Sequence, residues 1–178
     1  MAVNQLRSPL DALKFVVEFA QINLQEVPAK RLPAIDLQVQ RFINRETPGH
    51  WHTAAPDPAL LRELQSRAFS LFRDLLTVTP RQSLAIAGDL LLTFFAVSDD
   101  TGRVRVIVNG TAVARFLHQI IRVLEATGFD RLFVCPAPGC GRFFVKVTKK
   151  TYCSTRCQSR VYMRQYRKDF YGKTTRPK

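Results

Sequence analysis

Four cysteines carry the clearest chemistry of this 178-residue chain, and they are all the thiols it has: Cys135, Cys140, Cys153 and Cys157. Four residues separate the first pair, three separate the second, and twelve lie between the pairs. Two close pairs joined by a short segment are typical of one tetrahedral zinc site, because each pair supplies two thiolates from one turn. Four thiolates leave no coordination position for water, so the spacing predicts one structural Zn²⁺ ion.

Disulfides are the alternative for these thiols, and the rest of the chain argues against them. The first apolar stretch is interrupted by Asp11, Lys14 and Glu18, and no small-residue cleavage site follows, so it does not predict a secretory signal. The most apolar segment, 84–97, is too short to cross a bilayer of ~30 Å. We therefore expect a soluble, cytoplasmic protein without a membrane partner, and in that compartment clustered thiols favour metal binding.

The residues around the thiols predict a treble-clef-like finger made of a knuckle, a hairpin and a helix. Gly141 can adopt the backbone conformation that a metal-binding turn needs. A hairpin is expected between 143–147 and 151–153. Ser154 is a good helix cap, which would place Cys157 in the first helical turn, where the helix dipole stabilises its thiolate.

A helix that starts at Ser154 would carry a row of arginines. At ~100° per residue, positions 156, 160, 164 and 167 fall within an arc of about 80°. No acidic residue follows four positions later to neutralise them, whereas phosphates would relieve their repulsion and release counterions. The predicted nucleic-acid contacts are Arg142, Lys149, Lys150, Arg156, Arg160, Arg164, Arg167 and Lys168. The alternative is a basic helix face that is merely solvated.

An aromatic stripe lies next to that row on the same helix and contains Tyr162, Tyr166 and Phe170. We expect it to pack against the apolar side chains of the hairpin, which are Phe143, Val145 and Val147. Exposed tyrosines beside the arginines would instead favour base stacking on single strands, whereas buried ones favour a helix laid along duplex DNA.

The net charge divides the chain into two parts. Residues 131–178 hold 13 Lys or Arg against one acidic residue, Asp169, whereas residues 1–130 hold 14 against 13 acidic residues. Nearly all of the net charge of +13 therefore belongs to the C-terminal part. This asymmetry predicts a neutral domain, 1–130, followed by a domain, 131–178, that meets a polyanion.

The segment 131–168 resembles the CGNR zinc fingers, found mainly in bacterial proteins regarded as transcription regulators. The shared features are "CP…CGRFFV", "YCS" and a last cysteine followed by an Arg-rich helix. After that cysteine the family has Gly-Asn-Arg and this chain has Gln-Ser-Arg. The resemblance implies zinc binding and duplex DNA binding on the nucleoid. In the family an α+β domain called ABATE usually precedes the finger, which implies that residues 1–130 sense a small-molecule effector or mediate homodimerisation.

The N-terminal domain is expected to be α+β, with more helices than strands. Apolar residues recur at helical spacing in 10–26, 58–77 and 111–127, whereas 35–46 is ambiguous between a helix and a strand. A β-hairpin is expected around the turn 99–102. These elements give the finger a folded partner domain but contain no motif of their own.

Enzyme activity is not expected. The chain has no phosphate-binding glycine loop, nucleophile elbow or paired-carboxylate pattern. His50, His52 and His118 could form a second metal site, but no cysteine or carboxylate supplies a further ligand, and loop histidines are the default. The runner-up function is an RNA-binding or protein-interaction adaptor with a structural zinc site.

Overall fold

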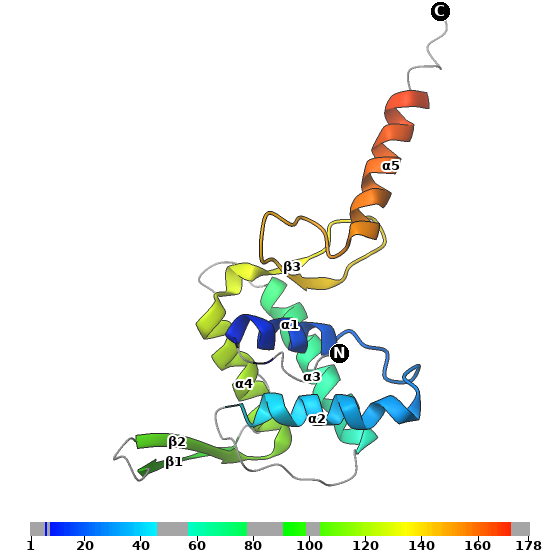
Figure 1. Ribbon diagram of the computed structural model, residues 1–178. Helices are drawn as coiled ribbons and strands as arrows, with labels where there is room; N and C mark the ends of the chain where they lie inside the picture. Colours follow the sequence, from blue (N-terminus) through cyan, green and yellow to red (C-terminus); the bar gives the residue numbers. More distant parts are fainter. Residues whose placement is uncertain (1–5, 7, 46–56, 78–90, 99–103, 172–178) are drawn as a thin grey trace, which may run out of the picture. The chain divides into compact units, whose positions relative to one another are not determined.

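The computed structural model describes residue 6 and residues 8–45, 57–77, 91–98 and 104–171. It divides the chain into two compact units, Met1–Phe129 and Asp130–Lys178. The described residues form five α-helices and two small antiparallel sheets of two strands each (Figure 1). The α+β class is thus confirmed. No helix in the described part of the chain is both long enough and apolar enough to cross a bilayer.

The first helix, α1 (Pro9–Phe19), begins where the sequence predicts and ends earlier. The Ser8 hydroxyl caps it by accepting a hydrogen bond from the Asp11 backbone N–H, 3.1 Å away. Beyond Phe19 the helical bonding gives way to tighter turns, in which the Gln21 N–H donates to the Glu18 carbonyl and the Ile22 N–H to the Phe19 carbonyl, and the Asn23 side chain then accepts from the Gln25 backbone N–H. The predicted continuation to residue 26 is wrong for this reason.

The other three helices of the first unit follow the pattern of apolar residues closely. The ambiguous segment forms a helix, α2 (Leu32–Ile43), and α3 (Pro58–Thr77) has the predicted bounds. Helix α4 (Ala112–Thr127) begins at Thr111, whose hydroxyl accepts from the Ala114 N–H at 3.1 Å. It ends at Gly128, whose φ of +84° suits glycine.

The core of the first unit lies where α1, α2 and α3 pack against α4. Phe116 of α4 stands at its centre, with its ring centroid 5.8 Å from that of Phe19 and 5.4 Å from that of Phe42. All three rings are fully buried, and they meet edge to face. This arrangement is favourable for aromatic rings and adds to the burial of their area.

The predicted β-hairpin of the first unit is present as β1 (Leu92–Ser98) and β2 (Val104–Gly110). The strands pair antiparallel, from Leu92 opposite Gly110 to Ser98 opposite Val104. The predicted turn residues, 99–102, lie outside the described residues, as do the two histidines of the segment 50–52. His118, on α4, meets the ring of Phe94 edge-on at 5.8 Å.

Within its described residues, the second unit contains two strands and one α-helix, which follow the 3-10 helix η2 (Phe129–Arg131). Strands β3 (Leu132–Val134) and β4 (Phe143–Val145) pair antiparallel, with Phe133 opposite Phe144. Helix α5 (Thr155–Tyr171) follows and carries the arginine row. The four cysteines lie between and after these strands and at the start of the helix.

Candidate metal centre and basic helix

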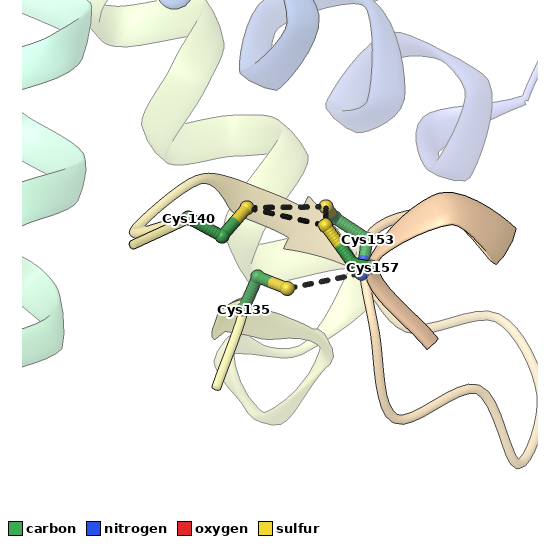
Figure 2. A group of neighbouring side chains, drawn as sticks. All are labelled: Cys135, Cys140, Cys153 and Cys157. Atoms are coloured by element: carbon green, nitrogen blue, oxygen red, sulfur yellow. Dashed lines mark hydrogen bonds between the residues drawn. The ribbon is translucent and has the colours of Figure 1, made fainter. Parts of the chain in front are cut away.

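The four cysteine sulfurs come together at one point of the second unit (Figure 2). Cys140, Cys153 and Cys157 form a triangle with Sγ–Sγ distances of 3.5 to 3.6 Å. The fourth sulfur, of Cys135, accepts from the Cys153 backbone N–H at 3.5 Å, and all four sulfurs lie within 4.8 Å of one another. This is the set of ligands that the spacing predicts.

The distances fit a zinc ion and not a pair of disulfides. A tetrahedron with Zn–S bonds of ~2.3 Å has sulfurs about 3.8 Å apart, close to the distances within the triangle. A disulfide would bring two sulfurs to about 2.05 Å, and all four thiols are free. Four cysteines that converge in this way can hold one structural Zn²⁺, which is how we assign the site.

Two turns deliver the ligands. Between Cys135 and Cys140 the chain reverses, with the Cys140 N–H donating to the Ala137 carbonyl at 3.0 Å. Gly139 and Gly141 have φ values of +70° and +60°, which other residues adopt only with strain. The second pair stands at the start of α5, where the Ser154 hydroxyl accepts from the Cys157 N–H at 3.3 Å. Ser154 therefore caps the helix, as predicted.

The protein environment already favours ionisation of part of this cluster. The Ser154 hydroxyl is the main group that lowers the pKa of Cys157, to about 7. Burial opposes ionisation of Cys135, but hydrogen bonds from the backbone N–H groups of Cys153 and Ala137 leave its pKa lowered. Burial raises the pKa of Cys153 to about 12. Four adjacent thiolates repel one another, so a divalent cation is what allows all four to be deprotonated together.

The core around these sulfurs is very small. Its buried members are Cys135, Ala137, Phe144 and Cys157. Tyr152 and Val161 pack against it, as do the other two cysteines. Leu132 and Phe143 are also buried in this unit, but so small a core gives little hydrophobic stabilisation to about 50 residues, and a bound metal would supply much of the folding free energy.

Val161 is a core residue that the sequence analysis missed. It stands four positions after Cys157 and therefore on the same face of α5. This i, i+4 spacing from a metal ligand is the signal that could have identified it.

The hairpin of the finger differs from the prediction. Strand β4 pairs with β3, which precedes Cys135, and residues 151–153 form no strand. Bonds from the Cys135 N–H to the Arg142 carbonyl and from the Lys146 N–H to the Arg131 carbonyl, both 2.8 Å, extend this pairing. The knuckle glycines permit the reversal that joins β3 to β4, whereas the predicted turn at 148–150 contains no glycine.

The predicted nucleic-acid contacts are all exposed. Three of them lie on the segment around β4 and five on α5, and the set is Arg142, Lys149, Lys150, Arg156, Arg160, Arg164, Arg167 and Lys168. Arg160 also donates from Nη1 to the Pro138 carbonyl at 3.3 Å, which ties α5 to the knuckle. A guanidinium has five N–H donors, so this bond leaves most of them for other partners.

The aromatic stripe does not pack on the hairpin, and that prediction is wrong. Tyr162, Tyr166 and Phe170 are 65%, 61% and 59% exposed. The reason is the helical phase: Cys157 and Val161 hold the first turns of α5 against the core, and every residue from Tyr162 to Phe170 is exposed. The helix thus continues beyond the finger as an exposed rod (Figure 1).

Within the described residues, the four thiols are the one group of three or more potential metal ligands. The fold and site define a zinc finger with a basic helix. Residues 131–168 match the family model of the CGNR zinc finger, and this segment contains the four converging cysteines. No curated protein and no solved structure matches the chain. The match does not reach residues 1–130, so an ABATE-like domain there stays a prediction.

Proposed function

We propose that this protein binds nucleic acid through its zinc finger and basic helix, and that it is a DNA-binding regulator of transcription that acts on the nucleoid in the cytoplasm. The observation that carries the proposal is the convergence of four thiols at the start of a helix whose basic residues are exposed. Binding, and not catalysis, is the proposed activity, because four thiolates close the coordination sphere of the metal.

Zinc has an indirect part in this function. When bound, it links the knuckle to the first turn of α5 and so fixes the helix to the finger. The bond from Arg160 to Pro138 joins the same two elements. The chain's own basic residues then meet the phosphates, and the metal contacts no ligand beyond the thiolates.

The electrostatics support a polyanionic partner. The second unit contains Asp130 and Asp169 as its acidic residues against 13 Lys or Arg. The Asp169 carboxylate accepts from the Gln165 side chain at 3.3 Å, on the far side of α5 from the arginine row. Phosphate neutralisation by such a surface releases counterions and gives affinity that falls steeply with salt.

For the first unit we propose the role of a sensor or dimerisation domain. The support is the order of the two domains, which is that of the family the finger resembles, together with a separate packed core of four helices. A small-molecule effector or a second copy of the chain would act there.

The test is binding of the zinc-loaded full chain to fluorescein-labelled duplex and single-stranded DNA, followed by fluorescence anisotropy over a series of salt concentrations. We expect the logarithm of affinity to fall linearly with the logarithm of salt, and polyglutamate to compete poorly. Binding that does not depend on salt, or polyglutamate that competes as well as DNA, would instead support a protein-interaction adaptor.

A further inference from the structure

Helix α5 exposes two surfaces that lie next to each other. The arginine row consists of Arg156, Arg160, Arg164 and Arg167, and the aromatic stripe consists of Tyr162, Tyr166 and Phe170. At ~100° per residue the stripe spans about 80° and begins about 40° from the row. We propose that α5 holds a single strand of nucleic acid, with its phosphates along the arginine row and its unpaired bases stacked on the aromatic stripe. This inference rests on the nucleic-acid binding proposed above.

The exposure of the stripe is the first support. Large aromatic side chains at 59% to 65% exposure are unusual on a surface that has no ligand, and three of them follow one another along one helix. The fold does not require them there, because Cys157 and Val161 already provide the buried face of α5. The core of the finger therefore does not account for these exposed rings.

The geometry of the rings is the second support. Tyr166 and Phe170 are stacked, with centroids 5.7 Å apart and planes 18° from parallel. Tyr162 stands one turn earlier, a rise of about 6 Å, which corresponds to roughly two nucleotides at 3.4 Å per base. The stripe therefore offers two platforms, Tyr162 and the Tyr166–Phe170 pair, at a spacing that one strand can follow.

The arginine row matches the length of the same strand. From Arg156 to Arg167 the helix rises about 16 Å, which spans roughly five phosphates of one strand. Exposed arginines along a groove or face, next to aromatic platforms, are the combination by which proteins bind single strands without sequence preference.

A duplex would leave the stripe unused. In paired DNA each base face is covered by its neighbours, and an aromatic side chain reaches it only after unstacking, at a few kcal/mol per step. An unpaired strand presents its base faces freely. The exposed tyrosines thus favour single-stranded regions over fully paired ones.

Charge decides against a second copy of the chain as the occupant. Two α5 helices that meet through their stripes would bring two arginine rows close together, and like charges across an interface are unfavourable. A nucleic-acid strand carries both an apolar base face and the opposite charge.

The experiment uses the zinc-loaded full chain and three labelled ligands of equal length, about a dozen nucleotides, which covers typical site sizes. They are oligothymidine, an abasic strand with the same phosphates, and a duplex. Anisotropy at one fixed salt concentration should give oligothymidine an affinity at least about tenfold above the abasic strand, since stacking contributes on the order of a factor of ten per base. Duplex should bind more weakly than oligothymidine.

Variants separate stacking from charge. The double variant Tyr162→Ala with Tyr166→Ala leaves Phe170 as the one ring of the stripe, so it should lose most of the preference for oligothymidine over the abasic strand, with the abasic affinity unchanged. Tyr162→Phe with Tyr166→Phe should behave like wild type, because it keeps the rings. Gln165→Ala, outside the stripe and on the far side of α5 from the arginine row, is the matched control and should change nothing.

Equal affinity of the unmodified chain for oligothymidine and abasic strands would overturn this inference while leaving the proposed function intact. The same holds if the tyrosine-to-alanine variant keeps the preference for bases. Absence of salt-dependent binding to all three ligands would overturn the proposed function itself. Binding to vesicles of anionic phospholipid without binding to any oligonucleotide would overturn both and identify a membrane surface as the partner.

Discussion

The salt dependence of binding is the property that the structure predicts most quantitatively, and the variant Arg160→Ala with Arg164→Ala tests it. Both side chains are exposed, and alanine is the best helix former, so α5 should remain folded. The hydrogen bond from Arg160 to the Pro138 carbonyl is lost, at about 1 kcal/mol or less.

The magnitude follows from the number of basic residues at the surface. If all eight predicted contacts meet phosphates, the slope of log affinity against log salt is about −5.6 on a single strand, at about −0.7 per phosphate. The double variant removes two contacts and should reduce the slope to about −4.2. Between about 0.05 and 0.2 M salt, affinity should then fall roughly 300-fold in the variant and roughly 2,000-fold in the wild type.

The assay is anisotropy with labelled oligothymidine at five or more salt concentrations. Arg62→Ala with Arg67→Ala, on α3, removes the same charge from the first unit and is the matched control. The control should keep the wild-type slope. A variant slope equal to that of the wild type, or a control slope reduced by the same amount, would refute the assignment of phosphate contacts to α5.

Three further predictions concern the metal and the two cores. Cys140→Ser removes one ligand. The purified chain should therefore contain less than one zinc per chain by atomic spectroscopy, and residues 131–171 should become sensitive to protease. A variant that is fully zinc-loaded and resists protease would contradict the four-thiol site. Ser154→Ala removes the hydroxyl that lowers the pKa of Cys157, so protons compete more strongly for that thiolate. During acidification, a chromogenic zinc indicator should report metal loss at a higher pH than in wild type. An unchanged midpoint pH of metal loss would show that the Ser154 hydroxyl does not tune this ligand. Phe116→Ala leaves a cavity at the centre of the first unit. It should lower the free energy of unfolding in urea by about 3–5 kcal/mol, while the zinc content stays at one per chain. A loss of stability below about 1 kcal/mol would show that the core lies elsewhere.

Local chemistry explains what could be predicted from the sequence. The four ligands follow from the cysteine spacing, and the start of α5 follows from Ser154, because both depend on residues only a few positions apart. The bounds of α3 follow in the same way from its apolar pattern and from Asp57 before it, whose carboxylate accepts from the Ala59 N–H at 2.8 Å.

Errors arose where the outcome depends on competition between distant partners. The segment 143–145 could pair either with 132–134 before it or with 151–153 after it. It pairs with β3, because Gly139 and Gly141 at positive φ allow the chain to reverse between these two strands. The aromatic stripe was expected to be buried because apolar residues usually are, yet the phase of α5 is set by Cys157 and Val161. The segment 35–46 was ambiguous because its apolar residues alternate at first, and packing against α4 and against Phe15 of α1 favours the helix α2.

The central claim is that one zinc ion, bound by the four cysteines, organises the second unit so that its basic helix can bind nucleic acid. The most direct measurement is stepwise addition of zinc to the chelated full chain in the presence of labelled oligothymidine, with anisotropy as the readout. The account predicts that binding is lost on chelation and recovers linearly up to one zinc per chain, then stays constant. Binding that persists unchanged in chelator, or that keeps rising well beyond one zinc per chain, would contradict it.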